Sequence, residues 1–145
     1  MVARDVQFTV LALSEKVREH ISSLLTKNDH PSVGIADLDD LMNFLKGKDN
    51  AIIFIDSEAV VAYGAGMVSK LKMACRECRL IVLCSQVHRN LVKRVMELGA
   101  YGCIIEPYPE WEFATMVKPI LTDLKVDRKG KSLKNKRLGR KSSAE

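Results

Sequence analysis

The chain has 145 residues, of which 47% are hydrophobic and 28% are charged. That length is enough for one well-buried domain and too short for two domains of typical size. No apolar stretch approaches the roughly 20 residues that a membrane span needs, and the polar start of the chain lacks the layout of a signal peptide. We therefore expect one globular domain in the cytoplasm.

The positive charge is concentrated at the C-terminal end of the chain. Nine of the 23 Lys and Arg residues lie between Lys125 and Glu145, where the acidic residues are Asp127 and Glu145 alone. The preceding residues contain more acidic than basic side chains. This asymmetry predicts a folded domain over residues 1–124 and a basic tail over residues 125–145, which is too poor in large apolar side chains to form a core.

Short apolar runs alternate with amphipathic segments through the first 124 residues. The runs predict strands at residues 7–13, 32–36, 51–55, 79–84 and 102–105. Apolar residues at helical spacing predict five helices, at residues 17–27, 38–45, 63–75, 91–96 and 109–124. Strands that are apolar on both faces and joined by helices are typical of a buried parallel sheet. The sequence therefore predicts a doubly wound α/β domain with five parallel strands and five helices.

Pro119 lies well inside the last predicted helix. Proline cannot donate the backbone hydrogen bond that a helix interior requires. We therefore expect a kink or a break there, which would redirect the end of the helix.

Several polar side chains follow the predicted strands at one edge of the sheet. Ligands of open parallel sheets bind outside the carboxyl ends of the strands. Asp56 directly follows the apolar run IIFI and lies at that edge. The other residues expected there are Leu13, Ser14, Cys84, Ser85, Glu106 and Pro107. An aspartate in this place is either a phosphoryl acceptor or metal ligand, or a turn residue that hydrogen-bonds local backbone amides.

Three local motifs occur in an order that characterises one known family. Asp56 is followed by Gly64, the segment MELGA ends at Ala100, and the segment IIEPY ends at Tyr108. With these motifs the chain from Gln7 to Leu124 resembles the receiver domain of bacterial response regulators. The resemblance implies a flavodoxin-like fold with strand order 2-1-3-4-5, Asp56 at the phosphoacceptor position, and a proline that is usually cis after the fifth strand.

The phosphorylation site of that family is degenerate in this chain. The family has two Mg²⁺-binding acids, a switch hydroxyl, a switch aromatic residue and a lysine, which neutralise and read a phosphoryl group. These positions correspond here to Ala12 and Leu13, to Cys84 with Ser85 one place later, to Cys103, and to Glu106 before Pro107. Asp56 is therefore expected to be repelled by Glu106, and neighbouring carboxylates raise one another's pKa.

The four cysteines are expected to be thiols, because disulfides are uncommon in a reducing compartment. Cys75 and Cys78 form a CxxC motif. Cys84 and Cys103 cannot complete a zinc site with that pair, since the strand after Cys78 spans roughly 20 Å. They are instead expected to be neighbours on adjacent strands. No chemistry is assigned to the histidines, which share no metal-ligand spacing and have no nearby nucleophile in the sequence: His20, His30 and His88.

The predicted function is that of a degenerate receiver that binds a protein partner without phosphorylation, without enzymatic activity and without a cofactor. The resemblance implies a partner surface from Leu91 to Leu124, and the partner would be a sensor kinase, an output protein or a second copy of the chain. One alternative is that Asp56 is still phosphorylated. Another is that the tail binds nucleic acid or an anionic surface through its cations. Those cations are Lys129, Lys131, Lys134, Lys136, Arg137, Arg140 and Lys141.

Overall fold

The computed structural model of the protein describes residues 6–129. Val6–Phe113 form one compact unit. The helical residues from Ala114 onward belong to a second unit, and the two units are described separately. The part of the predicted basic tail from residue 130 onward lies outside the described residues.

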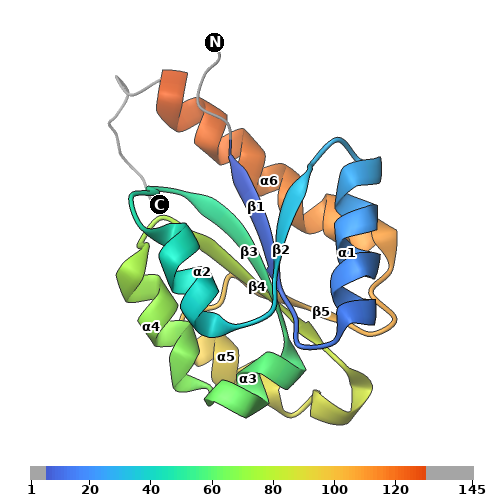
Figure 1. The fold of residues 1–145 in the computed structure, drawn as a ribbon. Coiled ribbons are helices and arrows are strands. Elements are labelled where there is room, and N and C mark those ends of the chain that lie inside the picture. The colour runs from blue at the N-terminus through green and yellow to red at the C-terminus, as the bar shows by residue number, and fades with distance from the viewer. Residues whose placement is uncertain (1–5, 130–145) are drawn as a thin grey trace. The chain divides into compact units, whose positions relative to one another are not determined.

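A five-stranded parallel sheet runs through the first unit in the order β2-β1-β3-β4-β5 (Figure 1). This confirms the flavodoxin-like order implied by the resemblance. The strands are β1 (Gln7–Leu11), β2 (Ser32–Ile35), β3 (Ala51–Asp56), β4 (Arg79–Cys84) and β5 (Gly102–Ile105). Leu11 pairs with Ile55 and Asp56 pairs with Leu83, so the carboxyl ends of β1, β3 and β4 lie at the same edge.

The helices begin where the sequence supplies side-chain caps. Ser14 Oγ accepts a hydrogen bond from the Val17 N–H at 3.2 Å, and Asp37 Oδ1 accepts one from the Asp40 N–H at 2.9 Å. The helices are α1 (Glu15–Lys27), α2 (Leu38–Leu45), α3 (Ser57–Tyr63), α4 (Gly66–Ala74), α5 (Leu91–Glu97) and α6 (Glu110–Lys129), with a short 3₁₀ helix η1 (Gln86–His88). Within the described part of the chain, no helix combines the length and the apolar character needed to cross a membrane.

The described residues form six α-helices, whereas the sequence predicted five. The helix predicted at residues 63–75 is α4, and the additional helix α3 lies before it, in a segment for which the sequence predicted no helix. The chain turns at Gly64, between these two helices. Gly64 has φ 92° and ψ 142°, a backbone conformation that residues with a Cβ rarely adopt. Its N–H bonds to the Val60 carbonyl at 2.8 Å and ends α3. Glycine here sets the direction in which the chain leaves the Asp56 region.

Both faces of the sheet are covered by apolar packing, as the doubly apolar strands predicted. Ile53 and Ile55 point to the face that α2, α3, α4 and α5 cover (Figure 1), and both are fully buried. Phe54 alternates to the other face, where its ring centroid lies 5.4 Å from that of Phe113 in the first turn of α6. β3 is therefore buried on both sides up to its last residue, Asp56.

Helix α6 continues through Pro119 without interruption, so a break is absent there, and a kink at this residue stays a prediction. One proline removes a single donor from the backbone ladder, and the hydrogen bonds on either side can carry the helix past it. The helix also extends to Lys129, beyond the predicted domain boundary at residue 124.

Cys75 and Cys78 form a disulfide, so the expectation of thiols at these two positions was wrong. Cys75 is the C-cap of α4, and the Cys78 N–H bonds back to the Cys75 carbonyl at 3.2 Å. This tight turn brings the two Cα atoms to 5.4 Å, a separation that a disulfide can bridge. Cys84 and Cys103 are free thiols, in agreement with the prediction.

Substitution of Gly64 tests the turn between α3 and α4. Gly64→Ala should destabilise the domain by about 1–3 kcal/mol, because alanine is strained at this φ and ψ. Gly66→Ala is the matched control: Gly66 starts α4, and an added Cβ there meets no atom within 4 Å. That variant should be neutral or slightly more stable. Urea unfolding midpoints of the two variants measure the difference, and equal midpoints would contradict the assignment of strain to Gly64.

Candidate functional site

Asp56 ends β3 and caps the helix that follows it. The residue is 3% exposed, and its Oδ1 accepts a hydrogen bond from the Ala59 N–H at 2.9 Å. The backbone N–H groups of Leu13 and Ser14, in the turn after β1, also face this carboxyl and lower its pKa. Asp56 therefore joins the start of α3 to the β1–α1 turn, which is the turn-residue role that the sequence left as one alternative.

Burial raises the pKa of the Asp56 carboxyl above its ordinary value. The backbone amides of Ala59, Leu13 and Ser14 lower it, and the nearby charge of Glu58 raises it further. The predicted direction is confirmed, but the cause predicted for it, repulsion by Glu106, was wrong. Glu58 lies next to Asp56 on the first turn of α3, whereas Glu106 is bound to a neighbouring loop.

Glu106 stands at the end of β5, where the family has a lysine. Its Oε1 accepts a hydrogen bond from the Gln86 N–H at 3.0 Å, and its carbonyl accepts one from Gln86 Nε2 at 2.7 Å. These two bonds join the loop after β5 to the loop after β4. The peptide bond from Glu106 to Pro107 is cis, as the resemblance implied.

Tyr108 follows Pro107 and is 8% exposed. Burial raises the pKa of its phenol to about 12, and the charges of Glu106 and Asp56 act in the same direction. The phenol therefore remains protonated at neutral pH, and these charges place it near both carboxyl groups. Near the two carboxyl groups the chain thus has a neutral phenol.

Two serines and a histidine form a second polar cluster beside Asp56. His88 Nδ1 lies 2.9 Å from Ser57 Oγ and 3.0 Å from Ser85 Oγ. Ser57 Oγ also accepts a hydrogen bond from the Ser85 N–H at 3.1 Å. The two hydroxyls can donate to an unprotonated Nδ1, and a protonated Nδ1 can donate to either of them. The cluster joins the loop after β3 to the loop after β4.

Sequence reasoning missed Ser57 and His88 as members of this site. It assigned no chemistry to His88, because no nucleophile is close to it in the sequence. The two serines that contact it lie after β3 and β4, and the pairing of these strands brings both to one ring nitrogen. The sequence feature that pointed to this cluster was Ser85. It lies one residue after the position of the family's switch hydroxyl and three residues before His88.

The positions of the two metal-binding acids carry no side-chain oxygen. Ala12 is fully buried, and its carbonyl accepts a hydrogen bond from Arg18 Nη1 at 2.5 Å. Leu13 is 39% exposed. Among residues 6–129, no three His, Cys, Asp or Glu side chains come together in a group that could hold a metal ion. The residues at this edge therefore do not fit the Mg²⁺ that phosphoryl transfer to a receiver requires.

The switch positions are occupied by a pair of interacting thiols. The interaction of the two thiols lowers the pKa of Cys84, and together with burial it raises that of Cys103. They lie on the adjacent strands β4 and β5, which confirms that they are neighbours. Cys84 is fully buried, so its side chain belongs to the core and is not exposed as a ligand for a phosphoryl group.

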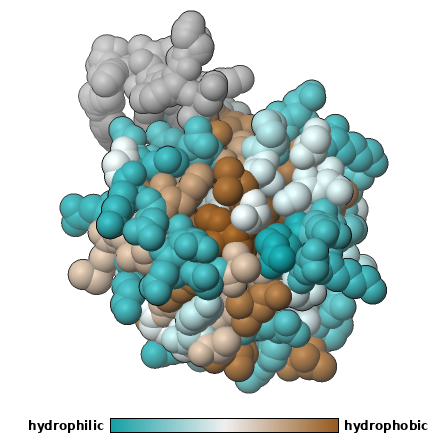
Figure 2. Space-filling model, in the orientation of Figure 1, coloured by the Kyte–Doolittle hydropathy of each residue, from teal (hydrophilic) through white to brown (hydrophobic). Residues whose placement is uncertain are grey.

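Exposed apolar side chains lie next to the polar groups at the carboxyl edge of the sheet. Leu13 follows β1, Val61 is on α3 and Val87 is on η1, with exposed fractions of 39%, 55% and 81%. Figure 2 shows hydrophobic patches along the lower end of the molecule, where Figure 1 draws α3. Glu58 and Glu106 are also exposed, so the edge presents mixed acidic and apolar surface.

The basic residues predicted to bind anions mostly lie outside the described residues. Lys129 is the last residue of α6. The others, from Lys131 to Lys141, are not described, and the prediction for them stays a prediction.

Comparison of the sequence with models of protein families gives no match, and no curated protein matches it. The fold does match solved structures. A response regulator from Thermotoga maritima superposes with a TM-score of 0.69 at 17% identity, over 81% of this chain and 98% of that chain. A response regulator receiver protein from Pseudoalteromonas atlantica gives 0.69 at 19% identity, over 81% and 98% of the two chains.

A third match is described as related to pilus assembly and comes from Burkholderia pseudomallei. It has a TM-score of 0.68 at 13% identity and covers 79% of this chain and 88% of that chain. At these identities the matches establish the fold alone. The chain has the five-stranded fold of response-regulator receiver domains, and the role of its site must be argued from its own residues.

The raised pKa of Asp56 predicts how stability depends on pH. Because the folded state holds this proton more tightly than the unfolded state, ionisation of Asp56 costs stability. Its contribution is greatest below the ordinary pKa of aspartate and is lost as the pH rises through the raised value. Asp56→Asn keeps an oxygen that can accept from the Ala59 N–H and cannot ionise. The variant should therefore become progressively more stable than wild type as the pH rises.

Urea unfolding of wild type and Asp56→Asn from about pH 3 to pH 7 measures this difference. Glu58→Gln is a suitable companion, because it removes the neighbouring charge and should reduce the effect. A stability difference that does not change with pH would contradict the raised pKa of Asp56.

Proposed function

We propose that this protein is a degenerate receiver domain that works in signal transduction by binding a protein partner, without phosphorylation and without enzymatic activity. The single observation that carries the proposal is the state of Asp56, which is buried and caps α3. A phosphoacceptor must instead expose its carboxylate to a donor and to a metal ion. Here the carboxylate oxygens of Asp56 instead face backbone amides at the start of α3 and in the β1–α1 turn.

The electrostatics at this edge also oppose phosphorylation. A phosphoryl group adds close to two negative charges, which receivers offset with Mg²⁺ and a lysine. In this chain Glu58 and Glu106 are close enough to Tyr108 for their charges to raise its pKa, as is Asp56. A phosphoryl group on Asp56 would therefore lie close to the acidic side chains of Glu58 and Glu106. Ala12 and Leu13 offer no side-chain oxygen that could bind a compensating metal ion.

A binding role needs an exposed surface, and the region implied by the resemblance offers one. Three large apolar side chains between Leu91 and Phe113 are exposed: Met96 by 42%, Tyr101 by 40% and Trp111 by 67%. Exposed aromatic and methionine side chains are typical of protein-binding surfaces. Trp111 lies in the first turn of α6, two residues before Phe113. Because Phe113 is buried, it anchors this turn and holds Trp111 in position to contact a partner.

Titration with Mg²⁺ and beryllofluoride, which mimics an acyl phosphate, tests the absence of phosphorylation. We expect the amide NMR spectrum of the wild-type chain to remain unchanged. Leu13→Asp/Glu106→Lys is the matched positive variant, because it restores one metal-binding acid and the lysine at positions that are both exposed. This variant should show saturable shifts near Asp56. Saturable shifts in wild type, centred on the same residue, would refute the proposal.

Alanine substitution tests the partner surface. A partner captured by the intact chain should lose at least tenfold in affinity with Trp111→Ala, which is about 1.4 kcal/mol or more. Met73→Ala is the matched control, because Met73 is 81% exposed on α4 and lies outside the proposed surface. Asp56→Asn should also keep full affinity. Calorimetric titration of the three variants measures these affinities, and equal losses for Trp111→Ala and Met73→Ala would locate the binding surface elsewhere.

A further inference from the structure

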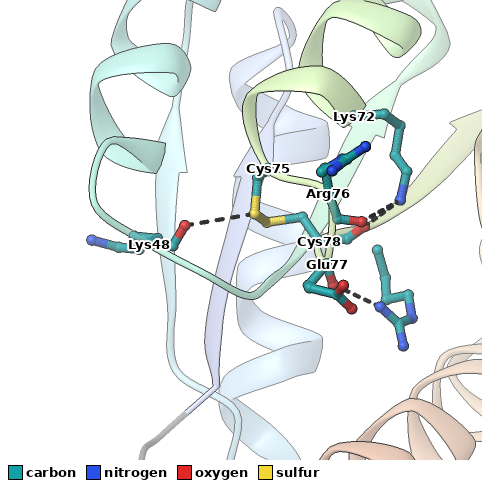
Figure 3. The surroundings of a disulfide bond; sticks show 7 residues. Lys48, Lys72, Cys75, Arg76, Glu77 and Cys78 are labelled. Carbon is teal, nitrogen blue, oxygen red and sulfur yellow. Dashed lines mark hydrogen bonds between the residues drawn. A yellow bond between two sulfur atoms is a disulfide. The ribbon is translucent and has the colours of Figure 1, made fainter.

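The Cys75–Cys78 disulfide lies in the turn between α4 and β4 (Figure 3). Because it links residues three positions apart, it constrains this turn and does not join distant parts of the fold. We infer that it is a reversible redox element, which a dithiol reductant opens and a disulfide oxidant closes while the domain stays folded.

The turn keeps its hydrogen bonds when the disulfide is open. Lys72 Nζ donates to the Arg76 carbonyl at 3.1 Å and to the Cys78 carbonyl at 2.9 Å. Arg79 Nη1 donates to the Glu77 carbonyl at 2.6 Å (Figure 3). None of these bonds involves sulfur, so they can be retained after reduction. The folded domain is therefore compatible with both redox states.

The reduced state would also gain a hydrogen bond that the disulfide cannot make. Cys75 Sγ lies 3.8 Å from the carbonyl oxygen of Lys48, in the turn between α2 and β3. A disulfide sulfur carries no proton, whereas the thiol of reduced Cys75 could donate to this oxygen. The surroundings of Cys75 therefore suit a thiol as well as the disulfide.

Access to the two sulfurs limits the exchange. Cys75 and Cys78 are only 3% and 0% exposed, so the turn must open locally before a reductant reaches them.

The chemistry is ordinary thiol–disulfide exchange. A thiolate of the dithiol attacks one sulfur, forming a mixed disulfide and releasing the other cysteine as a thiolate, which takes a proton. The second thiol of the reductant then displaces the remaining cysteine and closes its own disulfide. Two electrons pass from the dithiol to the protein, and the reverse exchange with a disulfide oxidant restores the Cys75–Cys78 bond.

Opening the turn would affect two neighbouring turns. One is the α2–β3 turn, which contacts it at Lys48. The other is the α5–β5 turn, where Gly99 packs so closely on the Lys72 side chain that an added Cβ would lie 3.2 Å from Lys72 Cγ. Gly99 falls within the region from Leu91 onward in which we placed the partner surface. The redox element itself is independent of that proposal.

Alkylation of the intact chain under native conditions provides the first test. After equilibration with dithiothreitol, both Cys75 and Cys78 should be alkylated, and after glutathione disulfide neither should be, as peptide mass spectrometry will show. Circular dichroism should report the same folded domain in both states. The inference fails if the pair is reduced only in denaturant, or if it never forms a disulfide.

Hydrogen exchange provides the second test. Loss of a cross-link that closes four residues should raise the local opening equilibrium about twenty-fold. Amides from Lys72 to Leu80 should therefore exchange faster after reduction, while those of α1 remain unchanged. Cys75→Ser/Cys78→Ser should exchange like the reduced wild type and should not respond to dithiol. Identical exchange of oxidised and reduced wild type would show that the bond does not control the turn.

Discussion

The carboxyl group of Asp56 must find hydrogen-bond partners at a place that water does not reach, and the loops around it are arranged to supply them. β3 is buried on both faces up to this residue, so its last side chain enters the domain at the carboxyl edge of the sheet. A buried carboxyl group without partners is costly. The Ala59 amide donates to this carboxyl at the start of α3, and the amides of Leu13 and Ser14 in the β1–α1 turn face it.

The loops at this edge are joined to one another in the same way. Gln86 and Glu106 connect the loops after β4 and β5, and Ser57, Ser85 and His88 connect the loops after β3 and β4. A phosphorylation switch requires that charge arriving at the aspartate rearrange such loops. In this chain Asp56, Glu106 and the cluster of Ser57, Ser85 and His88 already have local hydrogen-bond partners, and a stable arrangement suits a domain that presents one fixed surface.

The sequence was sufficient to predict most of the fold, because hydrophobic pattern determines strands that are buried on both faces. It predicted five parallel strands, and the family motifs added their order. Helix α3 escaped prediction because its start depends on the Asp56 cap and its end on the backbone conformation of Gly64, which hydrophobic pattern does not reveal. The same limit applies to Cys75 and Cys78, whose pairing depends on how tightly the chain turns after α4.

At the site, sequence reasoning identified Asp56 and Glu106 but misjudged how they interact. It assumed that residues aligned with neighbouring family positions act on one another directly. In the structure Glu106 is bound to Gln86, and the charge that acts most directly on Asp56 comes from Glu58 on the same helix turn. The contacts of Ser57 and His88 likewise depend on strand pairing. Side-chain partners at a strand end are chosen by the loops that meet there, which alignment alone does not specify.

The two edges of the sheet are stabilised by different means, and this difference bears on how such a domain could be controlled. At the carboxyl edge the constraints are hydrogen bonds among loops, and at the amino edge the α4–β4 turn is closed by a covalent bond. If the domain works without phosphorylation, as proposed, a signal that acts elsewhere on it remains a route of control. The turn at Cys75 and Cys78 contacts two neighbouring turns through Lys48 and Lys72, so a change there could reach the rest of the amino edge without passing through Asp56.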